Sequence, residues 1–154
     1  MTDLQPTPET VAAPTNRVTG VGRLLIVVYG LLALAATGRS FVQLLEPKVF
    51  GPAPLAYSLS ALAAVVYIAA TVALINRGAV WYRLAWATIS FELLGVLVVG
   101  TLSLIDPALF AHKTVWSVYG SGYGFVPLVL PLLGMWWLRK HPAAASRPAP
   151  AGRA

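Results

Sequence analysis

The stretch LAWATISFELLGVLVVGTLSLI, Leu84 to Ile105, decides the fold of this chain. It is mostly apolar, and Glu92 is its one charged residue. A hydrocarbon core about 30 Å thick needs about 20 helical residues, and this stretch supplies them. Because lipid offers the backbone no hydrogen-bond partners, we expect a helix here and not an open strand. The stretch is therefore predicted to be a transmembrane helix.

Three further apolar runs surround this stretch, and together they predict an all-α protein. The expected architecture is an antiparallel four-helix transmembrane bundle in which prolines kink the last helix. The chain is 58% hydrophobic and 10% charged, whereas a soluble domain carries about a quarter charged residues. Segments without apolar periodicity, rich in Pro, Thr or Ala, are predicted to be disordered tails at both ends. The predicted spans cover residues 24–45, 55–75, 84–105 and 118–138, within a membrane domain of 23–141 between tails of 1–22 and 142–154. Alternatively, the last helix is a short one that starts near Tyr123, and the glycine stretch before it forms its cap in a locally thinned bilayer.

The basic residues are distributed unevenly between the two ends of the predicted bundle. Only Lys48 and Lys113 lie in the opposite loops, and Arg39 falls inside a span. The positive-inside rule then predicts that both termini lie in the cytoplasm. No basic patch with interleaved aromatic residues is present, so we expect no nucleic-acid partner. The cytoplasmic set is Arg17, Arg23, Arg77, Arg83, Arg139, Lys140, Arg147 and Arg153.

The first span has an alternative interpretation. RLLIVVYGLLALAATG, Arg23 to Gly38, resembles a cleavable signal peptide, with a basic start and a short apolar core. Cleavage would leave three spans with unchanged orientation. The apolar sequence resumes at FVQLL, and acidic residues precede the run, which favours a retained span.

Glu92 is the residue most informative about function. It lies nine residues into its span, roughly 12 Å past the cytoplasmic edge. A carboxylate at that depth is costly, so it should face the bundle and be either hydrogen-bonded or protonated. One interpretation is a proton or cation site, and the other is a structural hydrogen bond between helices. Tyr67 has a similar depth on the second span and is the predicted partner.

Arg39 introduces a polar face at the outer end of the first span. Gln43 and Glu46 follow it at i+4 and i+7, so the three share one helix face. Arg39 lies about 9 Å below the outer edge, which is within reach of snorkelling. We expect snorkelling or contacts with Gln43 and Glu46. An ion pair with Glu92 is a further alternative, although the two depths differ by roughly 10 Å.

The stretch VYGSGYGFVPLVLP, Val118 to Pro131, combines glycines with two prolines. It does not complete a phosphate-binding glycine pattern, and no pore helix precedes it as a potassium filter would require. Gly120 and Gly124 form a small-xxx-small pair, which favours close helix packing. In a continuous helix, Pro127 and Pro131 would each free a carbonyl, to be bonded by outer hydroxyls from Ser58, Ser60, Thr101 or Ser103. The hypotheses are a kinked helix over a polar outer pocket, or a kink without a ligand.

The sequence lacks the combinations of residues that are typical of catalytic and metal sites. The chain has no cysteine, and His112 and His141 lie in different loops. No nucleophile, base and orienting group come together in the sequence. We therefore expect no enzyme activity, no cofactor and no metal.

APLAYSLSALAAVVY, ELLGVLVVGTLSLIDPALF and TVWSVYGSGYGFVPLVLP resemble the small four-span integral membrane proteins of actinobacteria. The resemblance extends from about Arg23 to Arg139 and implies a plasma-membrane protein without implying an activity. Small multidrug-resistance transporters are a more distant comparison. Their essential glutamate is in the first span, whereas the acid here, Glu92, is in the third.

Two functions follow as hypotheses. The first is a non-enzymatic accessory or scaffold subunit that acts through helix contacts, with the lipid bilayer, a larger membrane protein or a second copy of the chain as partner. The second is a small transporter or lipophile-binding protein that uses Glu92 as a proton or cation site.

Overall fold

The computed structural model describes residues 20–45, 54–108, 110 and 112–142, and in these residues every regular element is helical. The predicted all-α bundle is thereby confirmed. Nearly all of both predicted tails lies outside the described residues, although the first helix already begins at Val21. The elements in chain order are α1 (Val21–Leu45), α3 (Pro54–Ile75), α4 (Ala79–Ile105), the short 3-10 helix η1 (Ser117–Tyr123) and α5 (Val126–Lys140).

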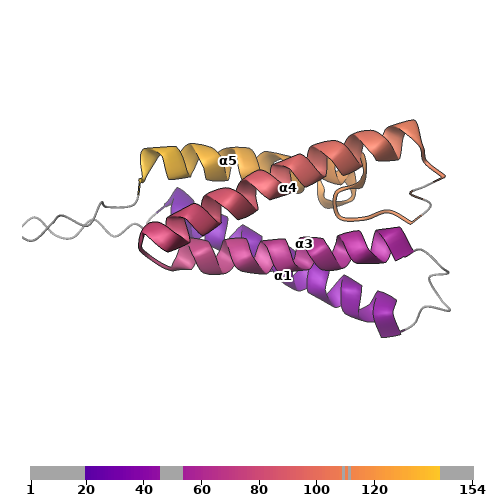
Figure 1. Ribbon diagram of the computed structural model, residues 1–154, viewed down its shortest axis with the longest axis horizontal. Helices are drawn as coiled ribbons and strands as arrows, with labels where there is room; N and C mark the ends of the chain where they lie inside the picture. Colours follow the sequence, from indigo (N-terminus) through magenta and orange to yellow (C-terminus); the bar gives the residue numbers. More distant parts are fainter. Residues whose placement is uncertain (1–19, 46–53, 109, 111, 143–154) are drawn as a thin grey trace, which may run out of the picture.

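Consecutive long helices run antiparallel, so the start of α1, the α3–α4 turn and the end of α5 lie at one end of the bundle (Figure 1). Helix α1 packs on α3, α3 on α4, and α4 on both α5 and η1. Contacts between α1 and α5 are few. Neighbouring helices therefore pack closely on three sides of the bundle and only loosely on the fourth, between α1 and α5.

On α3 and α4, buried residues recur at alternating steps of four and three along the helix and form a stripe. Such spacing is typical of helices packed at a small crossing angle. Many stripe residues are alanine, which lets helix backbones approach closely where lipid provides no hydrophobic drive between helices. Glu92 occupies one of these positions, so its side chain points into the bundle. The stripes are Ala56, Ser60, Ala63, Tyr67, Ala70 and Leu74 on α3, and Ala85, Ile89, Glu92, Val96, Val99 and Ser103 on α4.

The last span is bent, but it is not the continuous helix predicted over residues 118–138. Helices η1 and α5 meet at an angle of 98°. The break lies at Gly124 and Phe125, whose φ angles of 61° and 60° are left-handed. Pro127 follows the break in the first turn of α5, where a helix tolerates proline because its amide would have no helical partner anyway. The change of direction therefore lies just before the prolines.

The residues before α5 occupy the space that the missing outer turns would have filled. Helix α5 has 15 residues, about 22 Å of rise, which is less than a bilayer core requires. The chain returns from the end of α4 toward the middle of that helix before α5 begins (Figure 1). Val115, Trp116 and Ser117 are buried there. We call residues 114–123 the re-entrant segment.

Candidate functional site

Glu92 and Tyr29 form a hydrogen bond at the centre of the bundle. The Tyr29 hydroxyl donates to Glu92 Oε2 over 2.7 Å. Both side chains are 0% exposed. Helices α1 and α4 do not pack directly against each other, so this bond crosses the diagonal of the bundle. The Tyr29 and Glu92 side chains thus join two helices whose backbones are not neighbours.

The prediction that Tyr67 is the hydrogen-bond partner of Glu92 is wrong. The Tyr67 hydroxyl instead accepts a hydrogen bond from Trp116 Nε1 at 2.9 Å. Its ring lies beside that of Tyr29, with 6.3 Å between the ring centroids. The depth of a residue on its helix does not say which way its ring points. Tyr67 therefore lies next to the Glu92–Tyr29 pair and connects it to the re-entrant segment.

Tyr29 was missed at the sequence level, although a signal was present. It lies on the stripe that continues through Leu25, Leu32 and Ala36, which are all buried. Its Cα is only roughly 8 Å past Leu24 by helical rise, nearer the membrane edge than the roughly 12 Å of Glu92 in its own span. The signal is the polar end of Tyr29 on a buried stripe, which favours contact with the intramembrane acid.

The surroundings of the Glu92 carboxyl are closed. A Cβ added to Gly134 of α5 would lie 3.7 Å from the Tyr29 hydroxyl and 3.0 Å from Ile89 Cδ1, so α5 approaches the pair closely. Three surface hollows of about 570, 410 and 200 Å³ have linings that do not include Glu92. Within the described residues, Glu92 Oε1 has no hydrogen-bond partner. One carboxyl oxygen is thus satisfied and the other is buried without a partner.

Arg39 does not pair with Glu92. Its Nη2 donates to the backbone carbonyl of Lys113, in the loop that leads to the re-entrant segment. Arg39 Nε, Ser40 Oγ and Gln43 Oε1 are buried with no hydrogen-bond partner among residues 20–45, 54–108, 110 and 112–142. Glu46, the other predicted contact, lies outside the described residues. The polar face predicted at the outer end of α1 therefore turns inward, and Arg39 links α1 to the outer loop.

Trp116 is buried between α3 and α4. A Cβ added to Gly95 would lie 2.8 Å from its ring, so α4 can accept the indole only at a glycine. The edge of its ring faces Phe91 at 6.4 Å between centroids. Its Nε1 is bonded to Tyr67 of α3. Trp116 thus anchors the re-entrant segment in the bundle and satisfies its own polar group at the same time.

The backbone after Trp116 turns left-handed, and α4 holds this turn. Val118 and Tyr119 have φ of 51° and 58°, conformations that cost roughly 1–3 kcal/mol each in non-glycine residues. The Val118 amide donates to Ser103 Oγ at 2.8 Å. The Tyr119 hydroxyl lies 3.0 Å from that of Thr101, and its ring fits against Gly100. The predicted role of these outer hydroxyls is corrected: they bond an amide and a phenol, not carbonyls freed by prolines.

Gly120 and Gly124 do not form the predicted helix-packing pair. Both have left-handed φ, 77° and 61°, and Gly124 ends η1. A Cβ on Gly120 would lie 2.8 Å from the Pro127 ring, whereas Gly124 has nothing within 4 Å. Gly120 therefore serves a tight turn against Pro127. Pro131 is buried inside α5, as the sequence placed it.

Three helices of the described chain are each long and apolar enough to cross a membrane, and η1 with α5 adds a fourth span if the bent pair is counted as one. Comparison with protein-family models, curated proteins and solved structures gives no match. The fold and the buried polar pair define a class, the multi-pass α-helical membrane proteins. The resemblance to actinobacterial four-span proteins stays a prediction.

Proposed function

We propose that this chain is a non-enzymatic accessory or scaffold subunit of the plasma membrane, with both termini in the cytoplasm. The observation that carries the proposal is the enclosure of Glu92, which is bonded to Tyr29 across the bundle and closed in by Gly134. A carboxyl held in this way stabilises one arrangement of helices. The excess of basic residues at one end of the bundle supports the orientation.

The outer surface of α1 and α3 supports a role in helix contacts. A hollow of about 570 Å³ lies there, with an almost wholly apolar lining that includes Gly30, Ala33 and Thr37 of α1 and Thr71 of α3. Small residues of this kind allow a neighbouring helix to approach closely in lipid. A transmembrane helix of a larger membrane protein is the partner that this surface fits under the proposal.

A second candidate is a small transporter or lipophile-binding protein with Glu92 as its proton or cation site. The unpartnered Glu92 Oε1 favours it, because an acid inside a membrane is a functional hypothesis by default. The chain of polar groups from Trp116 through Tyr67 to the neighbourhood of Glu92 would then connect the acid with the outer loop.

The experiment that separates the two candidates is purification of tagged full-length protein from its native membrane in mild detergent, followed by mass spectrometry. Wild type is compared with Glu92→Gln, which keeps an acceptor for Tyr29 but removes the ionisable group. Asp106→Asn is the matched control, the same change at an exposed position. A stoichiometric larger membrane protein, retained by all three variants, is the expected result.

A homo-oligomer that carries a lipophile or cation, lost in Glu92→Gln at unchanged protein level, would overturn the scaffold proposal. A lower protein level in Glu92→Leu, together with a normal level in Glu92→Gln, is the expected sign of a structural acid. In that case the hydrogen bond matters and the charge does not.

A further inference from the structure

Basic residues are concentrated at one end of the bundle. The acids that the structure describes are Glu92 in the core and Asp106 at the opposite end of α4. Five positive side chains therefore share the end that contains the α3–α4 turn. This basic end consists of Arg23, Arg77, Arg83, Arg139 and Lys140.

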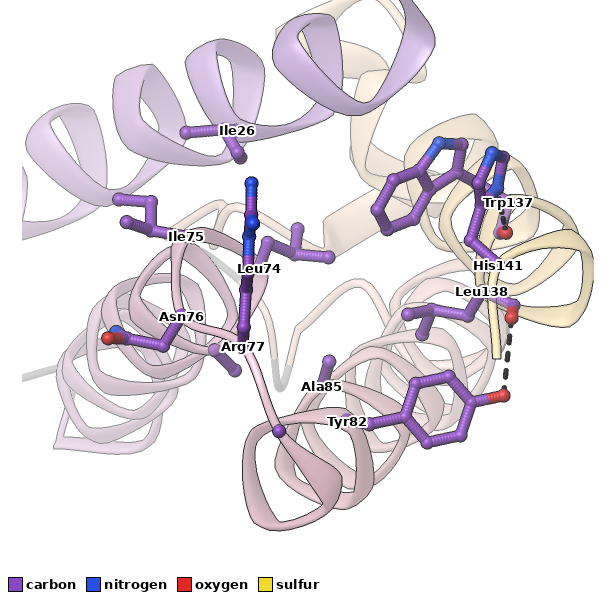
Figure 2. A pocket seen from close by; sticks show the side chains of 12 residues that line it. Ile26, Leu74, Ile75, Asn76, Arg77, Tyr82, Ala85, Trp137, Leu138 and His141 are labelled. Carbon is purple, nitrogen blue, oxygen red and sulfur yellow. Dashed lines mark hydrogen bonds between the residues drawn. The ribbon is translucent and has the colours of Figure 1, made fainter. Parts of the chain in front are cut away.

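A small cavity opens at the basic end, between all four long helices (Figure 2). Its interior is about 30 Å³, room for about one or two water molecules. Apolar side chains from each helix line it, including Ile26, Leu74, Ala85 and Trp137. A ligand larger than water must therefore lie at the mouth, with apolar groups against the walls.

Hydrogen bonds and stacking fix the wall between α4 and α5. The Tyr82 hydroxyl donates to the Leu138 carbonyl at 3.2 Å. The His141 ring stacks on Trp137 with 4.7 Å between centroids, and its Nδ1 lies 2.9 Å from the Trp137 carbonyl oxygen. The end of α5 is thereby held against the start of α4, so the mouth of the cavity keeps its shape.

Arg77 reaches over this cavity. It comes from the α3–α4 turn, and its side chain extends past Leu74 toward Ile26 of α1 (Figure 2). A guanidinium group offers a planar fork of donors that matches phosphate oxygens. A cationic fork directly above an apolar wall is suited to a molecule that has both an anionic group and hydrocarbon.

Two tryptophans place the basic end at the depth of lipid headgroups. The Arg139 guanidinium lies 5.8 Å from the centre of the Trp86 ring, and the Lys140 amine lies 4.3 Å from that of Trp136. Tryptophan is enriched at the boundary between headgroups and hydrocarbon. The mouth of the cavity therefore lies where a phospholipid presents its phosphate.

We propose that the mouth of this cavity binds one anionic phospholipid, with its phosphate on Arg77 and the start of its acyl chains along Ile26 and Leu74. Basic pockets between transmembrane helices on the cytoplasmic side bind lipid headgroups of this chemistry. Free phosphate lacks the hydrocarbon that the apolar wall would contact. The proposal rests on the membrane class of the protein and does not depend on the scaffold role.

The test is native mass spectrometry of full-length protein in mild non-ionic detergent, titrated with phosphatidylglycerol, phosphatidylcholine or sodium phosphate. We expect one phosphatidylglycerol to bind, about thirty-fold more tightly than phosphatidylcholine, which corresponds to roughly two basic contacts of about 1 kcal/mol each. Arg77→Gln should weaken phosphatidylglycerol binding about five-fold, the share of one such contact. Arg83→Gln, the same change at the same end but outside the cavity lining, should weaken it less than two-fold.

Each alternative result overturns the proposal. Equal losses of phosphatidylglycerol affinity in Arg77→Gln and Arg83→Gln would mean that the lipid is attracted to the basic end in general and not bound at a specific site. Competition by sodium phosphate at the concentration of the lipid would mean a phosphate site. If Arg77→Gln does not fold, Arg77→Lys keeps the charge without the fork, and unchanged binding in that variant would exclude the bidentate contact.

Discussion

Replacing Tyr29 by phenylalanine removes one hydroxyl from the centre of the bundle. The bond to Glu92 Oε2 is lost, and Oε1 already has no partner in the described part of the chain, so the whole carboxyl is left unsatisfied at 0% exposure. Water cannot replace the hydroxyl without entering a site closed by Gly134. We therefore expect Tyr29→Phe to destabilise the bundle despite an almost unchanged volume.

The size of this destabilisation depends on how deeply Tyr29 and Glu92 are buried and on the kind of hydrogen bond between them. Hydrogen bonds between transmembrane helices average about 0.6 kcal/mol and reach about 1.7. A bond to a charged group in a folded protein contributes about 1.5–3 kcal/mol. Because both Tyr29 and Glu92 are fully buried, we expect a value near the top of the membrane range, about 1–2 kcal/mol.

A double-mutant cycle measures this bond. Tyr29→Phe, Glu92→Leu and the double variant are unfolded at equilibrium in mixed micelles with increasing dodecyl sulfate. We expect the double variant to be at least about 1 kcal/mol more stable than the sum of the single effects predicts, because replacing both polar partners leaves nothing unsatisfied. Tyr82→Phe paired with Glu92→Leu is the control and should be additive within about 0.5 kcal/mol, because Tyr82 lies near the start of α4, about 15 Å from Glu92 by helical rise, and its hydroxyl bonds the Leu138 carbonyl. Additivity in the Tyr29 cycle would refute a direct bond.

The glycines of the outer half give two further predictions. Gly95→Ala should destabilise the bundle by about 1–3 kcal/mol, because its Cβ would lie 2.8 Å from the Trp116 ring, and equilibrium unfolding in mixed micelles would measure the loss. Gly120→Ala should destabilise the protein through both its φ of +77° and contact with a proline ring, whereas Gly122→Ala, with nothing within 4 Å, should change the free energy of unfolding by less than about 0.5 kcal/mol. Equal effects at Gly120 and Gly122 in the same assay would contradict the described turn.

The parts of the fold that depend on composition could be predicted from the sequence. The length and apolarity of three spans follow from the thickness of a bilayer, and the structure has helices at those positions. Helix α4 begins at Ala79, five residues before the predicted start at Leu84, because the apolar run that defined the span begins only after Arg83. A helix can continue through the headgroup layer, where hydropathy no longer marks it.

The partner of Glu92 depended on direction as well as depth. Both Tyr29 and Tyr67 lie on buried stripes, and both rings approach the acid. The directions of the side chains distinguish them, because the Tyr29 hydroxyl reaches Glu92 Oε2, whereas the Tyr67 hydroxyl lies against Trp116 Nε1 and accepts a hydrogen bond from it. Trp116 lies far along the chain, in a segment whose path no apolar periodicity could reveal. The apolar periodicity of single helices therefore could not identify Tyr29 as the residue that donates to Glu92.

The re-entrant segment shows how a short last helix can complete a bundle in lipid. Because α5 begins only at Val126, its corner of the bundle would expose unpaired backbone to hydrocarbon unless another segment filled the outer half. Trp116 supplies the buried volume, and Ser103 of α4 satisfies the Val118 amide of the left-handed turn. The strain of that turn is thus offset by packing and hydrogen bonds that only the assembled helices provide. In the sequence the glycines of α4 look like general packing residues. In the structure, Gly95 and Gly100 leave the space that the rings of Trp116 and Tyr119 occupy.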